Sequence, residues 1–388
     1  MLQHAQELVY SLLCLMPSVY QKASLKALLG RFLSEQGHAL PEHTPLKSAS
    51  SLSRFLNHYR WPTRQVIRTM RQATLQRIAA QRVHPTIPVR MLIDLTTLPK
   101  TGKFWHLSTP TDDPEVLDPW VRMLNGKRGL HLVVLYLVVG KCRVPWSFRV
   151  WRGKGHPSPV QLACKLLRMV PKSIVKGRKV IVQADTEFGT VEFLGALHRR
   201  QWRGVVGMRN NRRLQDGRQL KDLPGHAQRG LQVYFTDIDY PLTVSWFWLK
   251  RADNKRELRF VASTHPYSGN YLVQLGRKRW AIEGFFKTAK HQFGLHCFGQ
   301  STKLGVYRWL ILSLLAYLLA HWVELWSWPP VLDWKATSRL TLKKLLPDVL
   351  WLQLLKQIRR DVDIAAQYGF EVTINSLSYK AYRERCKI

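Results

Sequence analysis

Acidic residues are scarce in this sequence. Its 388 residues include 25 Asp and Glu against 60 Lys and Arg, and its formal net charge is +35. A protein so far from neutrality repels itself unless it meets a polyanion. The basic residues run along the whole chain and are not confined to a tail, so the sequence favours an extended nucleic-acid-binding surface over a merely basic protein.

Cysteine is also scarce. The five cysteines are scattered and form no CxxC pair: Cys14, Cys142, Cys164, Cys297 and Cys386. This pattern excludes a disulfide framework and argues against a structural zinc site. We therefore expect a protein of the reducing cytoplasm.

Long uninterrupted apolar runs are missing as well. The longest candidate, residues 305–326, has an unbroken apolar part only from Trp309 to Ala320, shorter than the roughly 20 residues of a membrane span. His321 and Glu324 follow in the same helical pattern, so we expect a buried helix against a sheet and no membrane association. The N-terminus lacks a basic region and a clear cleavage site, and we expect no signal peptide.

Several catalytic motifs are absent. The sequence has no P-loop, no HExxH and no GxSxG, which leaves nucleotide hydrolysis, zinc proteolysis and serine esterase chemistry without support. It also has no internal repeat and no low-complexity tract. A hydrophobic content of 46% in a chain of this length predicts two or three domains.

Hydrophobic periodicity divides the chain into five parts. A helical N-terminal part precedes a strand-rich part in which helices and strands then alternate, which is typical of a mixed sheet covered by helices. A β-rich insertion, two helices and a helical tail follow. The expected boundaries are 1–85, 86–209, 210–266, 267–328 and 329–388.

The N-terminal part ends in two predicted helices that are separated at residues 57–62. Thr63 is a plausible N-cap of the second helix, which carries Arg64, Arg68 and Arg71 on one face. This pattern resembles a helix-turn-helix unit that presents cations to a duplex. An ordinary amphipathic helix with a solvated basic face would give the same pattern, and the two interpretations carry equal weight.

Two acids lie in predicted strands, where burial should be greatest. Asp94 is in "MLIDL" and Asp185 ends "VIVQAD". A lone buried carboxylate is costly unless it is compensated, either by core cations or by a shared divalent metal. Both aspartates are at or near strand ends, where α/β sheets place their functional sites.

A third acid, Glu283, lies in a very basic predicted helix, residues 276–294. Arg279, Lys287 and Lys290 share its helical stripe. One interpretation is an exposed Glu283–Lys287 pair that contributes only a few tenths of a kcal/mol. The other is a metal ligand among cations that contact phosphates.

Asp94, Asp185 and Glu283 together could hold two Mg²⁺ ions roughly 3.5–4 Å apart, with Mn²⁺ as a possible substitute. Glu187 is expected to point elsewhere. An acidic loop is expected to be solvated and not a site; its acids are Asp112, Asp113, Glu115 and Asp118. Trp280 could stack on an unpaired base or belong to the core, and the core is favoured.

At these residues the chain resembles the DDE transposases of bacterial insertion sequences, in the group with a Tyr-x2-Arg-x3-Glu-x6-Lys motif. The motif here reads Gly276-x2-Arg279-x3-Glu283-x6-Lys290, and "IDLTTLPKTGK" and "VQADTEFGT" resemble the two aspartate blocks. The resemblance covers about residues 86–328. Gly276 departs from the family tyrosine, which helps to hold DNA near the cleavage site.

The resemblance implies a ribonuclease-H-like mixed sheet with flanking helices, with 86–209 and 267–328 as its catalytic domain. It also implies Mg²⁺-dependent nicking at transposon ends and strand transfer into target DNA, usually by cut-and-paste and often through hairpin ends. A homodimeric synaptic complex, with contacts from the C-terminal tail, is a further implication. Two alternatives remain: a DNA-binding regulator derived from a transposase, and a metal-dependent nuclease without strand transfer.

Overall fold

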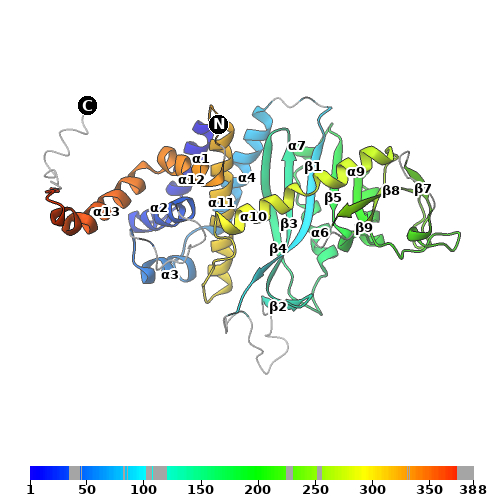
Figure 1. Cartoon of the computed structure of the whole chain (residues 1–388), viewed down its shortest axis with the longest axis horizontal. Helices are drawn as coiled ribbons and strands as arrows, with labels where there is room; N and C mark the ends of the chain where they lie inside the picture. Colours follow the sequence, from blue (N-terminus) through cyan, green and yellow to red (C-terminus); the bar gives the residue numbers. More distant parts are fainter. Residues whose placement is uncertain are drawn as a thin grey trace, which may run out of the picture.

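The computed structural model describes residues 1–34, 44, 46–81, 84, 86–101, 107, 120–223, 230–250, 256–329, 331 and 333–373. The molecule is elongated, with a group of helices from both ends of the chain on one side and a large sheet on the other (Figure 1). The long helix α11 (Lys303–Trp326) stands between these two parts.

The N-terminal part is helical, as the periodicity predicts. Its helices are α1 (Leu2–Cys14), α2 (Val19–Ser34), α3 (Ala49–Asn57) and α4 (Thr63–Ala80). The predicted cap of α4 is wrong, because the helix begins at Thr63 and the N-cap residue is Pro62, which has no capping side chain. The hydroxyl of Thr63 serves another purpose and accepts a hydrogen bond from Arg308 of α11 (2.9 Å).

The described part of the chain forms one sheet of nine strands. The strands are β1 (Val89–Pro99), β2 (Val121–Leu124), β3 (Lys127–Val139), β4 (Cys142–Val150), β5 (Val180–Ala184), β6 (Arg203–Met208), β7 (Leu231–Val233), β8 (Leu242–Lys250) and β9 (Arg256–Ser263). Strand β3 pairs antiparallel with β4 and β1, and β1, β5 and β6 are parallel. The order β4-β3-β1-β5-β6 with these directions is the expected ribonuclease-H-like arrangement, so the fold prediction is confirmed.

The strands of the predicted insertion extend this same sheet. Strand β9 pairs antiparallel with β6, and β8 and β7 continue outward from it. Helix α9 (Gly269–Lys278) covers this region, and its Leu272 and Leu275 are buried with Ile181, Val205 and Val261 of the sheet. Strands β8 and β9 therefore lie beside α9, the helix that follows them in the chain.

The remaining helices cover the sheet or join the N-terminal part. They are α6 (Pro159–Arg168), α7 (Lys172–Val175), α8 (Val191–His198), α10 (Ala281–His291), α12 (Trp334–Leu345) and α13 (Pro347–Gln367), with short 3₁₀ helices η2 (Thr186–Phe188) and η3 (Leu220–Asp222). Helices α12 and α13 pack near α2, on the side of the molecule opposite to the outer strands β7 and β8 (Figure 1).

Helix α11 is a core helix, as expected for the long apolar segment. By length and composition it could cross a membrane, but 83% of its apolar window is buried inside the protein. Its Tyr317 hydroxyl hydrogen-bonds the hydroxyl of Tyr136 in β3 (2.7 Å). It also contacts α1, α2, α3 and α12, so it joins the helical part to the sheet.

Candidate active site

Two of the predicted acids lie side by side at neighbouring strands. In the parallel pairing of β1 and β5, Ile93 is opposite Ala184, so the next residues, Asp94 and Asp185, are adjacent. Asp94 continues in β1, whereas Asp185 follows the last residue of β5 and is the N-cap of η2. The Asp94 side chain is 13% exposed and that of Asp185 is 44% exposed.

The third acid reaches the same place from a broken helix. The sequence predicts one helix through residues 276–294, but the structure has α9 ending at Lys278 and α10 beginning at Ala281. Glu283 is in the first turn of α10, where the positive end of the helix dipole favours a carboxylate. The prediction of a continuous helix is therefore wrong, although Glu283 does lie with the two aspartates.

Arg279 lies at the break and joins the three acids. One guanidinium nitrogen is 2.9 Å from Asp94 Oδ2, and another is 2.9 Å from Glu283 Oε1 and 3.9 Å from Asp185 Oδ1. The Arg279 side chain is largely buried. Glu283 therefore pairs with Arg279, while Lys287 is exposed and makes no ion pair with it in the described part of the chain.

The electrostatics of this group show an excess of negative charge. Burial is the main cause that raises the pKa of Asp94 to about 7; the charges of Asp185 and Glu283 act in the same direction, and Arg279 and the Leu95 N–H oppose them. That N–H donates to Asp94 Oδ1 at 2.8 Å. Three carboxylates face one guanidinium, so the group is short of positive charge.

The donor set fits a hard divalent cation, because it consists of carboxylate oxygens alone. As they lie, no three His, Cys, Asp or Glu side chains in the described ranges are arranged to hold one metal ion. Instead, Arg279 contacts all three carboxylates. Asp94, Asp185 and Glu283 are the residues that could hold metal ions, and the guanidinium now balances part of their charge.

A cavity of about 290 Å³ opens beside this group. Asp185, Glu283 and Arg279 line it on one side, and strands β8 and β9 close the other with Phe247, Phe260, Val261 and Arg259. Sequence reasoning missed this wall, although the aromatic alternation in "SWFWLK" was the available signal. Strand pairing between β9 and β6 is what brings these residues to the acids.

Gly276 and Trp280 also line the cavity. A Cβ at Gly276 would be 3.3 Å from Val261 Cγ2, so a larger residue there would press on the wall. Trp280 is the N-cap residue of α10 and is 51% exposed. The interpretation of Trp280 as a core residue is therefore wrong.

Arg279, Lys287 and Lys290, the cations predicted to share one stripe with Glu283, have different surroundings in the structure. Arg279 faces the acids, whereas the Lys290 ammonium donates to the Thr97 carbonyl of β1 at 2.9 Å. Burial and the charge of Lys127 lower the pKa of Lys290. Lys287 is exposed.

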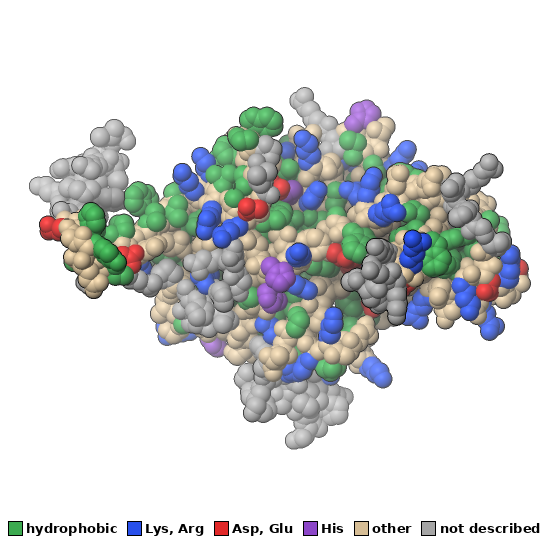
Figure 2. Space-filling view, viewed as in Figure 1, with side chains coloured by type: hydrophobic (Ala, Val, Ile, Leu, Met, Phe, Trp, Pro, Cys, Tyr) green, Lys and Arg blue, Asp and Glu red, His purple; other side chains and the backbone are tan. Residues whose placement is uncertain are grey.

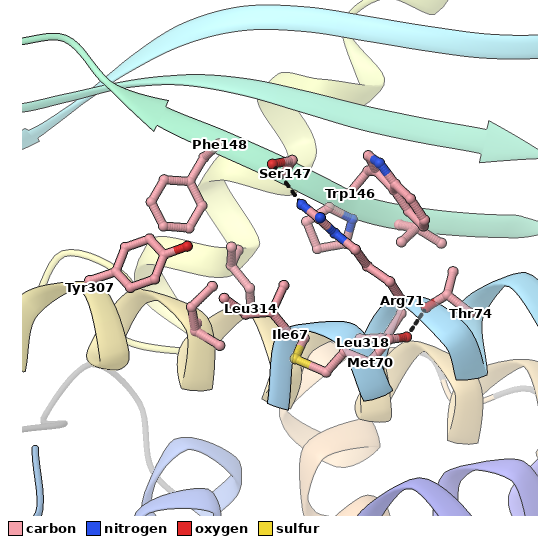
Figure 3. Close-up of a pocket in the computed structure, with 13 residues that line it drawn as sticks. Ile67, Met70, Arg71, Thr74, Trp146, Ser147, Phe148, Tyr307, Leu314 and Leu318 are labelled. Carbon is pink, nitrogen blue, oxygen red and sulfur yellow. Dashed lines mark hydrogen bonds between the residues drawn. The ribbon is translucent and has the colours of Figure 1, made fainter. Parts of the chain in front are cut away.

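Of the three arginines predicted to share an exposed face of α4, Arg64 and Arg68 are exposed. Arg71 instead points toward β4, where it donates to Ser147 Oγ at 3.1 Å and lies over the Trp146 ring (Figure 3). Burial lowers the pKa of Arg71. The prediction is therefore wrong for Arg71, which packs at a small cavity of about 40 Å³ between α4, β4 and α11.

Among the acids that the structure describes, Glu187 does not join the site. Glu187 is exposed, and its Oε1 accepts a hydrogen bond from Asn125 at 3.4 Å. The acidic loop lies outside the described residues.

A family model described as "Transposase DDE domain" matches residues 91–319, which is more than half of the chain and includes Asp94, Asp185 and Glu283. A solved structure, the piggyBac transposase synaptic complex with hairpin DNA, is similar with a TM-score of 0.49 and 13% identity, covering 100% of this chain and 86% of that chain. A search of curated proteins found no match.

The domain implies nuclease and transferase activity, and such enzymes generally use divalent metals. The chain belongs to the DDE transposase family, whose members move DNA by cut-and-paste transposition.

Proposed function

We propose that this protein is the transposase of an insertion sequence, which binds the terminal inverted repeats of the element, cleaves its ends and joins them to target DNA. The observation that carries this proposal is the convergence of Asp94, Asp185 and Glu283, from two strands and a helix, around Arg279. A protein that only binds DNA has no need for three acids at one point of a chain with a net charge of +35.

The three carboxylates would hold two Mg²⁺ ions, or Mn²⁺ as a substitute. When bound, such ions activate water or a 3′-hydroxyl and stabilise the leaving oxygen. Arg279 keeps the carboxylates together and offsets part of their mutual repulsion. Its planar fork is also suited to phosphate, so it can contact the DNA backbone beside the acids.

The basic surface supports DNA as the partner. Lys and Arg side chains are spread over the visible face of the molecule, with few acids between them (Figure 2). We assign the exposed Lys287, Arg64 and Arg68, together with the half-buried Lys290, to DNA phosphates. Trp280 is exposed at the cavity and is available to stack on an unpaired base.

The proposed setting is the bacterial cytoplasm, on nucleoid DNA, with a homodimer in the synaptic complex. The domain boundaries proposed from the sequence are retained, with the helical tail as a dimer contact. A DNA-binding regulator and a nuclease without strand transfer remain the competing functions.

Isosteric variants test the proposal. Asp94→Asn, Asp185→Asn and Glu283→Gln should each abolish nicking of a duplex made from the DNA that borders the gene, in Mg²⁺, while binding to that duplex is retained. Glu187→Gln is the matched control, because it removes an exposed acid next to the site, and it should nick normally. Nicking at the wild-type rate by the Glu283→Gln variant would refute the catalytic role.

A second readout separates the competing functions. Wild-type protein supplied with a pre-nicked end and a supercoiled plasmid should join the two. Nicking without joining would identify a nuclease, and binding without nicking would identify a regulator.

A further inference from the structure

A second cavity, of about 190 Å³, lies away from the acids. It is formed where the first residues of β1 meet α9, and Arg90, Val138, Tyr271, Leu275 and Lys278 line it. Small-molecule sites usually measure about 300–1,000 Å³, so this cavity is too small for a nucleotide and suits a smaller group.

Arg90 is the unusual residue of this cavity. Its guanidinium is half-buried, and it makes no side-chain hydrogen bond or ion pair with any residue that the structure describes. Burial lowers the pKa of Arg90 and the nearby Arg143 lowers it further, against Tyr271 and Tyr136; no carboxylate of the described residues is among these causes. A partly buried cation without a counter-charge is costly, so the site is short of an anion.

Helix α9 adds two more donors to the same place. Tyr271, Leu275 and Lys278 are spaced i, i+4, i+7 and so lie on one stripe of the helix. The apolar Leu275 is buried, whereas Tyr271 (37% exposed) and Lys278 present polar ends at the surface. A guanidinium, an ammonium and a hydroxyl around a small cavity match the acceptor oxygens of a phosphate.

The position of the cavity relates it to the catalytic acids. Arg90 and Asp94 are four residues apart in β1 and therefore point to the same face of the sheet, about 13 Å from each other. This distance is roughly the length of four base pairs along a duplex. Lys278 directly precedes Arg279 at the end of α9. Lys278 lines the cavity, and Arg279 contacts the acids.

We propose that Arg90, Lys278 and Tyr271 bind a backbone phosphate of DNA about four base pairs from the phosphate at the catalytic acids. The inference rests on the proposed function, because it assumes that DNA lies across Asp94, Asp185 and Glu283. The ligand is a phosphodiester of either the transposon end or the target DNA, and the cavity holds its position relative to the acids.

The salt dependence of DNA binding tests the contact. Arg90 and Lys278 bind the same phosphate, so Arg90→Ala, Lys278→Ala and the double variant should each reduce the slope of log K against log salt by up to about 0.9, the value for one phosphate contact. Lys165→Ala is the matched control, because it removes one positive charge from an exposed position on α6, and its slope should equal that of the wild type. Lys278 is exposed, so its variant tests the cavity even if Arg90→Ala folds poorly.

A neutral methylphosphonate placed at successive positions of a gene-border duplex locates the phosphate. One substitution about four base pairs from the nick should weaken wild-type binding and have no further effect on the Lys278→Ala protein. The same scan on a random target duplex, added to protein that already holds the end duplex, shows which DNA supplies the phosphate.

An unchanged slope for both variants, or equal losses in wild type and variant at every methylphosphonate position, would overturn the proposal. If the wild type nicks DNA and the slopes do not change, the cavity assignment fails while the proposed function stands. If the wild type neither binds nor nicks DNA, both fail.

Discussion

Arg308 offers the sharpest test of how the helical part is attached to the sheet. It is 3% exposed in α11, and its guanidinium donates to the Thr63 hydroxyl and to four backbone carbonyls at 2.9–3.3 Å. Those carbonyls belong to α3 and the turn before α4: Phe55, Leu56, Tyr59 and Trp61. It also lies 4.2 Å from the centre of the Trp61 ring. One side chain thus ties together the two helices of the expected DNA-binding unit.

The loss of stability expected for Arg308→Met follows from two opposing contributions. Three of the five acceptors share Nη1, which carries two hydrogens, so the guanidinium makes four full hydrogen bonds; at about 1.5 kcal/mol each, the low end for a charged donor, they contribute about 6 kcal/mol. Burial lowers the pKa of Arg308 to about 10, and a shift of this size corresponds to a desolvation cost of about 3 kcal/mol. Arg308→Met removes both contributions and should destabilise the α3–α4 region by about 3 kcal/mol.

Hydrogen exchange measures this loss where it occurs. Amide protection in α3 and α4 should fall by roughly 150-fold, which is the equivalent of about 3 kcal/mol, while β1 and β5 keep more of their protection. Arg339→Met is the matched control, because Arg339 is exposed in the middle of α12, and protection should stay unchanged. Equal protection of α3 in the Arg308→Met variant and in the wild type would refute the reasoning.

Two further predictions concern the charges described above. The raised pKa of Asp94 means that the folded protein holds this proton more tightly than the unfolded chain, so its contribution to stability is fully present below about pH 4 and is lost as the pH rises to about 7. In metal-free urea unfolding, the free energy of unfolding of Asp94→Asn should therefore rise relative to that of the wild type by up to about 4 kcal/mol across that pH range. A difference between the two proteins that does not change with pH would show that the pKa of this carboxylate is not shifted. Replacing both Arg64 and Arg68 by Ala should lower the slope of log K against log salt for DNA binding by about 1.8. Arg71→Ala should leave this slope unchanged and lower the unfolding midpoint, because Arg71 contacts Ser147. A changed slope for Arg71→Ala would show that Arg71 contacts DNA.

Much of the catalytic sheet could be predicted from local pattern. The apolar, β-forming run Val89–Pro99 is strand β1, and Gly140 and Lys141 separate β3 from β4. The two aspartates stood out because a carboxylate in an apolar strand is rare unless it has a function. Their adjacency followed from parallel pairing, which a sheet of this type imposes on neighbouring strands.

Other features depend on contacts that no local pattern encodes. The break between α9 and α10 comes at Arg279–Trp280, where nothing in the sequence resembles a helix stop. At the break Arg279 forms ion pairs with Asp94 and Asp185, which are long-range contacts, and with Glu283 four residues further on. The inward direction of Arg71 likewise depends on β4, which is more than 70 residues further along the chain.

The contrast between a strongly basic chain and its three acids can now be explained in terms of charge. The net charge of +35 attracts DNA, yet the point at which chemistry would occur carries three carboxylates against one guanidinium. A phosphate cannot approach such a group closely until more positive charge arrives, because like charges at a few ångströms in a partly buried site repel strongly. Burial is the first cause of the raised pKa of Asp94, and the charges of Asp185 and Glu283 add to it. Arg279 alone does not balance three carboxylates, so under the proposed function we expect the site to accept DNA only together with further cations, which divalent metal would supply.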